Sequence, residues 1–358
     1  MMPVEAMDSQ EWNNWITEQG SKAGFGQTTT WAAVNADAIG ADSIVVSIER
    51  TEHRRIGALF DVRQYGDPGG GPYQWLKRLL GGRGRLLECI DGPVIREDAT
   101  SRDFSCFLKC IDEQVRRSGA YVVNFHMPTT AISSTSATNL DIRHIFAANG
   151  YTIMPWLTAL VDLSVDEDEI FARFNRSARK GIRRCEKEGI WVEKCDCEAM
   201  FLEDFCSTYY GVSGKGTAFD LANKRRALAT WRIGDDAYRF FVARDMECQV
   251  LGTLGSYRFN GIATEIMSSR TAEADARHLP VQDLLHWELF RAHKALGDHT
   301  FNLAGFNPDP KTPKEIGIRR FKEKWGGSVV EVPYFTKHFE TIPLKYLRKL
   351  LRWLPRHI

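Results

Sequence analysis

Gly317–Gly327 reads GIRRFKEKWGG and lies near the carboxyl end of the chain. It places the ammonium of Lys322 directly beside the aromatic ring of Phe321. Its last three residues, Trp325–Gly327, can end a helix and turn the backbone sharply, because glycine adopts conformations that other residues avoid. A lysine at such a helix end could stabilise negative charge that develops on an acyl carbonyl oxygen. The same residues also suit a solvated helix with a glycine cap, so this pattern alone leaves both interpretations open.

The chain has 358 residues, which is enough for two domains of ordinary size, each with its own core. Its apolar content of 43% and charged content of 26% are typical of a soluble globular protein. The net charge is only +1. A polyanionic partner such as nucleic acid would therefore have to be bound by a local basic patch.

The eight cysteines are scattered, and no two have the C-x-x-C spacing of a zinc ribbon. The amino end shows no signal-peptide pattern, and no apolar run approaches the length that spans a bilayer. We therefore expect reduced thiols and a cytoplasmic protein without a bound metal or cofactor.

Strand and helix signals follow one another twice along the chain. In the first half we expect strands at 43–48, 55–62, 86–90, 120–125 and 156–163, and helices at 10–19, 104–118 and 141–149. In the second half we expect a basic helix, an antiparallel meander at 238–243, 248–258 and 263–269, a long helix at 280–296, a strand at 300–305, the lysine-bearing helix and a last strand at 328–332. This order predicts an α/β protein of acyltransferase type, with mixed sheets.

The basic helix, expected from Arg173 to Lys187, has a strongly cationic face, because five of its cations step at three and four residues. Like charges at this spacing repel each other, a cost that an anion lying over the face would offset. A phosphate backbone would serve, since lysine and arginine contacts to phosphates bind without regard to sequence. The alternative is a solvated helix partly neutralised by Glu186 and Glu188.

Other chemical signatures are weak. Arg277–Gln282 begins the long helix without the glycines that let backbone N–H groups approach a pyrophosphate, which argues against a standard CoA enzyme. His286 and His293 lie seven residues apart with no third ligand nearby, so a metal pair is not indicated. No serine or cysteine signature supports a covalent nucleophile. Leu344–Leu354 forms a basic amphipathic pattern that could lie on an anionic membrane or pack on its own domain.

Together these stretches resemble the Fem family, aminoacyl-tRNA-dependent transferases that add amino acids to peptidoglycan precursors. The resemblance rests on the segment from Gln27 to Trp31, the helix ending at Ile182–Gly189, and Phe321–Lys322 with Trp325–Gly327. Together with the loop Asn302–Asp309, these stretches cover nearly the whole chain in the family's order.

The resemblance implies two tandem acyltransferase domains of the GNAT type, at residues 1–163 and 164–340, followed by the amphipathic helix at 341–358. It implies that an acceptor amine attacks the aminoacyl ester of a tRNA directly, with Lys322 stabilising the oxyanion and Phe321 packing beside the 3′ end. The basic helix would hold the donor tRNA and the first domain the acceptor, an amine of a cell-wall precursor or of a related peptide or glycan. The implied donor-binding residues are Arg176, Arg179, Lys180, Arg183, Arg184 and Lys187, and the implied acceptor-binding residues are Gln27 and Trp31. Lys215, in the loop Gly211–Phe219, is our own candidate for a further acceptor contact.

Two departures from the family leave the acceptor open. The helical arm that some members insert in the second domain has no room here, because Gly189 leads directly into a strand. Asn35 stands where members that bind a nucleotide-linked precursor often have a lysine. The rival hypotheses are an acyl-CoA-dependent N-acyltransferase that acts on an amino sugar or peptide amine, and an inactive module that binds RNA or glycan.

Overall fold

A computed structural model describes residues 9–50, 53–64, 85–129, 141–212, 221–234 and 236–339. They form two compact units. Unit 1 takes in the described parts of Met1–Ala32, Gly40–Met154 and Pro333–Ile358, and unit 2 takes in Ala33–Ile39 with the described part of Pro155–Val332. These boundaries differ from the expected ones at residues 163 and 340. Lys215 and the expected helix at 341–358 lie outside the described residues.

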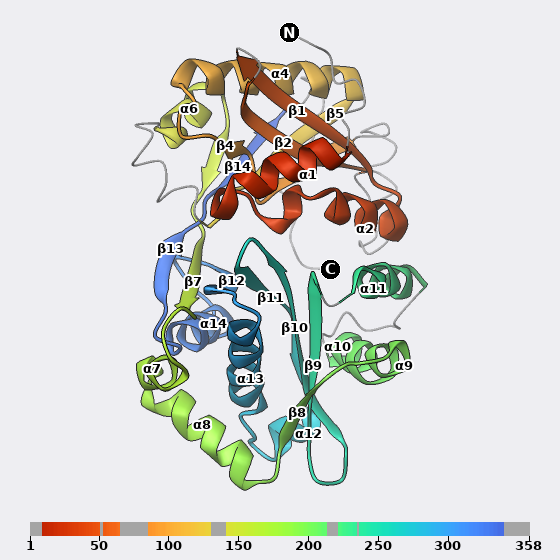
Figure 1. Ribbon diagram of the computed structural model, residues 1–358, viewed down its shortest axis with the longest axis vertical. Helices are drawn as coiled ribbons and strands as arrows, with labels where there is room; N and C mark the ends of the chain where they lie inside the picture. The colour runs from red at the N-terminus through yellow and green to blue at the C-terminus, as the bar shows by residue number, and fades with distance from the viewer. Residues whose placement is uncertain are drawn as a thin grey trace, which may run out of the picture. The chain divides into compact units, whose positions relative to one another are not determined.

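Unit 1 is built on a seven-stranded sheet of order β1-β2-β3-β5-β14-β6, with β4 paired to β2 (Figure 1). Only β3 and β5 run parallel among these neighbours, so the sheet is mixed, as predicted. The strands are β1 (Asp42–Arg50), β2 (His53–Gln64), β3 (Arg85–Ile90), β4 (Val94–Ile95), β5 (Ala120–His126), β6 (Thr152–Met154) and β14 (Tyr334–His338).

The longest helix of this unit, α4 (Ser101–Ser118), begins and ends at clear local signals. Thr100 and Asp103 form a capping box at its start, and Gly119 ends it in the left-handed conformation with φ 67°. Apolar residues at helical spacing, from Phe104 to Val115, pack into one core with the sheet. The other helices are α1 (Ser9–Glu18), η1 (Gly20–Lys22), η2 (Phe25–Gln27), the start of α2 (Thr29–Ile39) and α6 (Ile142–Ala148).

Unit 2 also has a seven-stranded sheet, of order β13-β7-β12-β11-β10-β9-β8. The meander β9–β11 is antiparallel, as predicted, and β11 runs parallel to β12. The predicted strand at 156–163 pairs with β12 and β13. The strands are β7 (Leu157–Asp162), β8 (Trp191–Lys194), β9 (Tyr238–Arg244), β10 (Val250–Phe259), β11 (Ile262–Arg270), β12 (Thr300–Phe306) and β13 (Ser328–Glu331).

The helices of unit 2 cover the two faces of this sheet (Figure 1). One face is covered by α7 (Glu167–Arg173), α8 (Arg176–Lys187), α13 (Val281–Ala295) and α14 (Pro313–Glu323), which share a core with α12 (Ala272–Ala276). The other face carries α9 (Glu198–Met200), the π-helix η3 (Phe201–Cys206), α10 (Ser207–Val212) and α11 (Leu221–Ile233). Among the described residues, no helix combines the length and the apolar character needed to cross a bilayer.

Candidate functional site

Lys322 lies in the last turn of α14, and the start of that helix is fixed by its sequence. Thr312 and Glu315 form a capping box, and Pro313 occupies the first helical turn, where its missing N–H costs nothing. The helix presents Lys322 to the interior, and only 8% of this residue is exposed. The solvated-helix interpretation therefore fails for Lys322.

The ammonium of Lys322 is held by the backbone of β12. It donates hydrogen bonds to the carbonyl oxygens of Leu303 and of Gly305, the second at 3.3 Å. These carbonyls belong to a β-bulge, because the pairing of β12 with β7 shifts register between Asn302 and Gly305. Ala304, at the centre of the bulge, has φ 59°, a conformation that a residue other than glycine rarely adopts.

Three side chains hold the bulge in this shape. The hydroxyl of Thr158 donates to the carbonyl of Ala304 at 2.7 Å, and the side-chain oxygen of Asn302 accepts from the amide of Ala304 at 3.0 Å. A Cβ at Gly305 would overlap the indole of Trp156, so only glycine fits there. The carbonyls that receive Lys322 are thus positioned before any substrate arrives.

Burial lowers the pKa of Lys322, because an ammonium loses its hydration in the interior, and the charge of Glu265 opposes this shift. The net direction is downward, so Lys322 gives up its proton more readily than a surface lysine does. An ammonium with little hydration interacts strongly with any negative charge brought close to it.

Phe321 and Trp325 pack on each other at the end of α14. The ring of Phe321 is half-buried, with its centroid 5.0 Å from His286 and 5.8 Å from Trp325. The ammonium of Lys324 lies 4.0 Å from the Phe321 centroid and forms an ion pair with Asp283 on α13. These contacts fix the end of α14 against α13.

The predicted helix stop after Lys322 is confirmed. Helix α14 ends at Glu323, and Gly326 follows in the left-handed region with φ 68°. A Cβ on Gly326 would overlap the carbonyl of Arg173, and one on Gly327 would meet the carbonyl of Leu160. Both glycines therefore allow the close approach of two backbones.

The basic helix begins later than predicted. Its first residue is Arg176, because the side chain of Asn175 caps the helix at Ala178. Arg173 ends the preceding helix α7 and forms ion pairs with Asp162 and Glu169, so it does not belong to the cationic face.

The six predicted donor-binding cations all lie on α8. Arg179 donates to the carbonyl of Ala172, and Arg183 lies over the ring of Phe171 at 5.6 Å. Neither contact neutralises the charge of the guanidinium. The six are Arg176, Arg179, Lys180, Arg183, Arg184 and Lys187, of which Arg179 is half-buried and the others are exposed.

The buried side of α8 packs closely on α13 at a glycine. A Cβ at Gly181 would overlap the carboxylate of Asp283, the residue that pairs with Lys324. The basic helix is thus connected through Asp283 to the end of the helix that carries Lys322.

We expect Gly181→Ala to destabilise the protein by about 1–3 kcal/mol, the usual cost of forcing an extra methyl group into a packed interior. Gly317→Ala is the matched control, because Gly317 is also helical but nothing lies within 4 Å of its Cβ position. The control should be more stable than the parent by up to about 1 kcal/mol, since alanine favours a helix. Denaturant unfolding of both variants measures the difference, and equal stabilities would show that α8 can move away from Asp283.

The predicted acceptor residues of unit 1 lie in different surroundings. Gln27 is 0% exposed, and among the described residues its side-chain amide bonds only within its own unit, donating to the carbonyl of Ile90 at 2.6 Å and accepting from the amide of Leu59 at 2.8 Å. It can therefore influence an acceptor only through the backbone that it holds. Trp31 is half-buried and donates from its indole N–H to Asp61 at 3.1 Å. Asn35 is buried in α2.

A Ser–His–Asp arrangement was not expected from the sequence. The Ser256 hydroxyl lies 2.7 Å from Nε2 of His293, and Nδ1 of His293 lies 2.8 Å from a carboxylate oxygen of Asp298. All three are buried, which keeps the hydroxyl away from any substrate. The cluster links β10 to α13 and the loop after it. No sequence signal marks it, because its members lie on separate elements.

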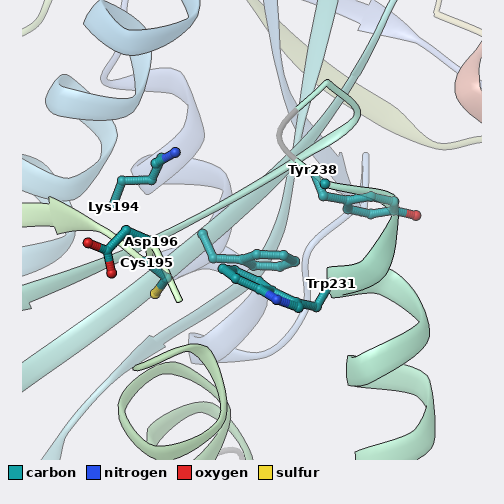
Figure 2. A pocket seen from close by; sticks show the side chains of 7 residues that line it. Lys194, Cys195, Asp196, Trp231 and Tyr238 are labelled. Atoms are coloured by element: carbon teal, nitrogen blue, oxygen red, sulfur yellow. The ribbon is translucent and has the colours of Figure 1, made fainter. Parts of the chain in front are cut away.

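A cavity of about 250 Å³ is lined by residues of β8, α11 and β9 and of the loops beside them (Figure 2). The rings of Trp231, Tyr238 and Phe240 form its apolar wall, and the carboxylate of Asp196 points away from them. Burial raises the pKa of the neighbouring Cys195 thiol to about 12, so this thiol is a poor nucleophile at neutral pH. The cavity includes none of the predicted site residues.

Comparison with known proteins identifies the fold. No protein-family model matches the sequence, and no curated protein matches it. Among solved structures, FemX superposes with a TM-score of 0.70 at 12% identity, covering 97% of this chain and 99% of that one. L-PGS from Bacillus licheniformis gives 0.56 at 16% identity over the whole of both chains. A tandem GNAT protein from the clavulanic acid biosynthesis pathway gives 0.55 at 9% identity, covering 95% and 98%.

At these identities the likeness establishes the fold alone. The chain has the Fem-type fold of two tandem GNAT-like domains, as the sequence resemblance predicts.

Proposed function

We propose that this protein is an aminoacyltransferase that moves an amino acid from aminoacyl-tRNA to an amine of a cell-wall precursor or of a related peptide or glycan. The observation that carries the proposal is the buried ammonium of Lys322, held at a β-bulge in a fold shared with FemX. We place the protein in the cytoplasm, where charged tRNA is found, with a peripheral membrane contact through the helix expected at 341–358.

In the proposed reaction the acceptor amine attacks the carbonyl carbon of the aminoacyl ester. A C–N bond forms, the carbonyl oxygen becomes an oxyanion, and Lys322 stabilises that charge. The bond to the ribose oxygen then breaks, the ribose hydroxyl takes up a proton, and the amine nitrogen loses one, which leaves an amide. No covalent enzyme intermediate is needed, in keeping with the burial of Ser256 and of the Cys195 thiol. Phe321 would pack beside the 3′ end, and positioning would supply most of the remaining rate.

The choice of tRNA as donor rests on α8. Among the described residues, the exposed cations of α8 form no ion pair that would neutralise them. Gly181, in the same helix, packs on Asp283, and Asp283 pairs with Lys324. A polyanion lying along α8 would therefore contact a helix that packs on Asp283, the residue paired with Lys324 at the end of α14. For the acceptor, Gln27, Trp31 and Lys215 remain predictions.

The rival donor, an acyl-CoA, would bring its pyrophosphate to the start of α13. That helix begins after Pro280 without a glycine that would let backbone N–H groups approach the phosphates. This feature favours tRNA over CoA.

The test is to incubate the purified protein with an amine acceptor and either tRNA charged with labelled amino acids or labelled acetyl-CoA. We expect label to enter an amide product from charged tRNA, and ribonuclease treatment of the donor should abolish it. Transfer from acetyl-CoA alone would identify the rival enzyme. Absence of product from both donors, with tRNA binding retained, would indicate an inactive binding module.

A further inference from the structure

Two largely buried side chains on separate elements, Glu265 and His286, approach each other near the end of α14. Glu265 on β11 is 11% exposed, and His286 on α13 is 0% exposed. Their nearest atoms, Oε2 of Glu265 and Nε2 of His286, are 3.5 Å apart, and neither atom has a hydrogen-bond partner other than this long contact among the described residues. Buried polar atoms left in this state are costly, so the pair calls for a functional explanation.

The other ring nitrogen of His286, Nδ1, donates a hydrogen bond to the backbone. Nδ1 lies 2.7 Å from the carbonyl oxygen of Gln282. A carbonyl oxygen can only accept a hydrogen bond, so Nδ1 must carry the proton. Nε2 then faces Oε2 of Glu265 at 3.5 Å.

Strand pairing brings Glu265 to the position where Lys322 is held. The parallel pairing of β11 with β12 ends at Thr264 and Asn302. The next residue on β11 is Glu265, and the next on β12 is Leu303, whose carbonyl accepts from Lys322. The ring of His286 is fixed in turn, because it stacks on Trp325 at 5.2 Å.

Three elements near Lys322 each contribute a definable group. Strand β11 contributes the Glu265 carboxylate, α13 contributes His286, and β12 contributes uncharged carbonyls. The other buried carboxylate on α13, Asp283, pairs with Lys324. The charge that acts on the Lys322 ammonium is that of the Glu265 carboxylate.

We propose that Glu265 is a positioning residue for transfer, and that its carboxylate keeps Lys322 protonated while the oxyanion forms. This inference rests on the proposed function of Lys322. Lys322 acts on Glu265 in turn. Burial alone would raise the pKa of the Glu265 carboxyl, but His286 and Lys322 together lower this pKa, so the carboxylate stays charged. Without Glu265, burial alone would act on Lys322 and lower its pKa further.

The experiment compares Glu265→Gln with the parent in single-turnover transfer from charged tRNA between pH 6 and pH 9, with spontaneous ester hydrolysis subtracted. Glutamine keeps the shape of the side chain and removes its charge. We expect rates within about twofold of the parent at acidic pH and up to roughly tenfold lower on the alkaline side, because a nearby opposite charge favours the charged form of a lysine by about this order. The alkaline fall in rate should therefore begin at lower pH.

Glu323→Gln is the matched control, since this carboxylate follows Lys322 directly but is exposed and pairs with Arg319. Its pH profile should follow that of the parent. A Glu265→Gln profile lowered equally at every pH would mean that Glu265 has only a structural role, and an unmoved alkaline limb would overturn the proposal.

A second readout does not depend on transfer. The titration of Lys322 can be followed by NMR in protein labelled at its lysines, with the signal assigned by its loss in Lys322→Met. We expect the midpoint to fall in Glu265→Gln and to stay unchanged in Glu323→Gln. If the midpoint shifts but the protein transfers no amino acid, the proposed function is refuted and the coupling between Glu265 and Lys322 stands. If the midpoint is unchanged in a protein that is active in transfer, only the coupling between Glu265 and Lys322 is refuted.

Discussion

Lys322→Met should lower the rate of transfer from charged tRNA by about a hundredfold or more, the range measured when an enzyme loses one donor to a developing oxyanion. Methionine keeps the unbranched shape of the side chain and removes its charge. Because Lys322 is buried and reaches β12, the loss would come from a fixed internal ammonium and not from a mobile surface group. Single-turnover kinetics with pre-charged tRNA measure the effect on the bond-forming step.

Lys314→Met is the control for this substitution, because Lys314 lies in the first turn of the same helix and is exposed. It should retain the parental rate. Thermal unfolding and tRNA affinity of Lys322→Met should show that the protein is folded and still binds its donor. A Lys322→Met protein as active as the parent would remove the lysine from the mechanism.

The second large effect concerns α8. Replacing Arg176, Lys180 and Lys187 together by glutamine should weaken tRNA binding and make its salt dependence less steep by about two to three in the slope of log K against log salt. The reason is that each phosphate contact releases counterions when the tRNA binds, so fewer contacts release fewer counterions. These three cations are exposed, and the substitutions spare Arg179 and Arg183, whose contacts help to hold the helix. Filter binding at several salt concentrations measures the slope.

A triple substitution on α4 provides the control. Lys109, Arg116 and Arg117 are exposed on that helix of unit 1, and glutamine at all three changes the net charge equally. If binding responds to overall charge, both triple variants should weaken it alike. If α8 is the contact surface, only the α8 variant should change the slope.

The secondary structure near the site was largely predictable, because local signals decide it. Gly189 and Gly297 were expected to end helices, and both have positive φ, 71° and 81°. The antiparallel meander followed from alternating apolar strands with short turns, and it is confirmed. The end of α14 followed in the same way from Gly326.

The surroundings of the candidate site were not predictable, because they depend on pairing between distant residues. Ala304 adopts a positive φ although alanine gives no hint of it, and the resulting bulge provides the carbonyls that receive Lys322. Glu265 and His286 looked like an ordinary strand residue and an ordinary helix residue. Gln27 was predicted to bind an acceptor, yet its side chain bonds to buried backbone. The sequence alone does not distinguish a glutamine that holds backbone from one that binds a ligand.

The path of the last described strand has a consequence for how the chain is made. Strand β14 lies between β5 and β6 and bonds to both. A polypeptide emerging from the ribosome would therefore hold these two strands with unpaired edges until some 180 further residues had been synthesised, about the distance from Met154 to Tyr334. Unit 2 can finish folding during that interval, whereas the sheet of unit 1 stays incomplete until the final segment is made. Until then, the unpaired edges of β5 and β6 expose the nascent protein to aggregation.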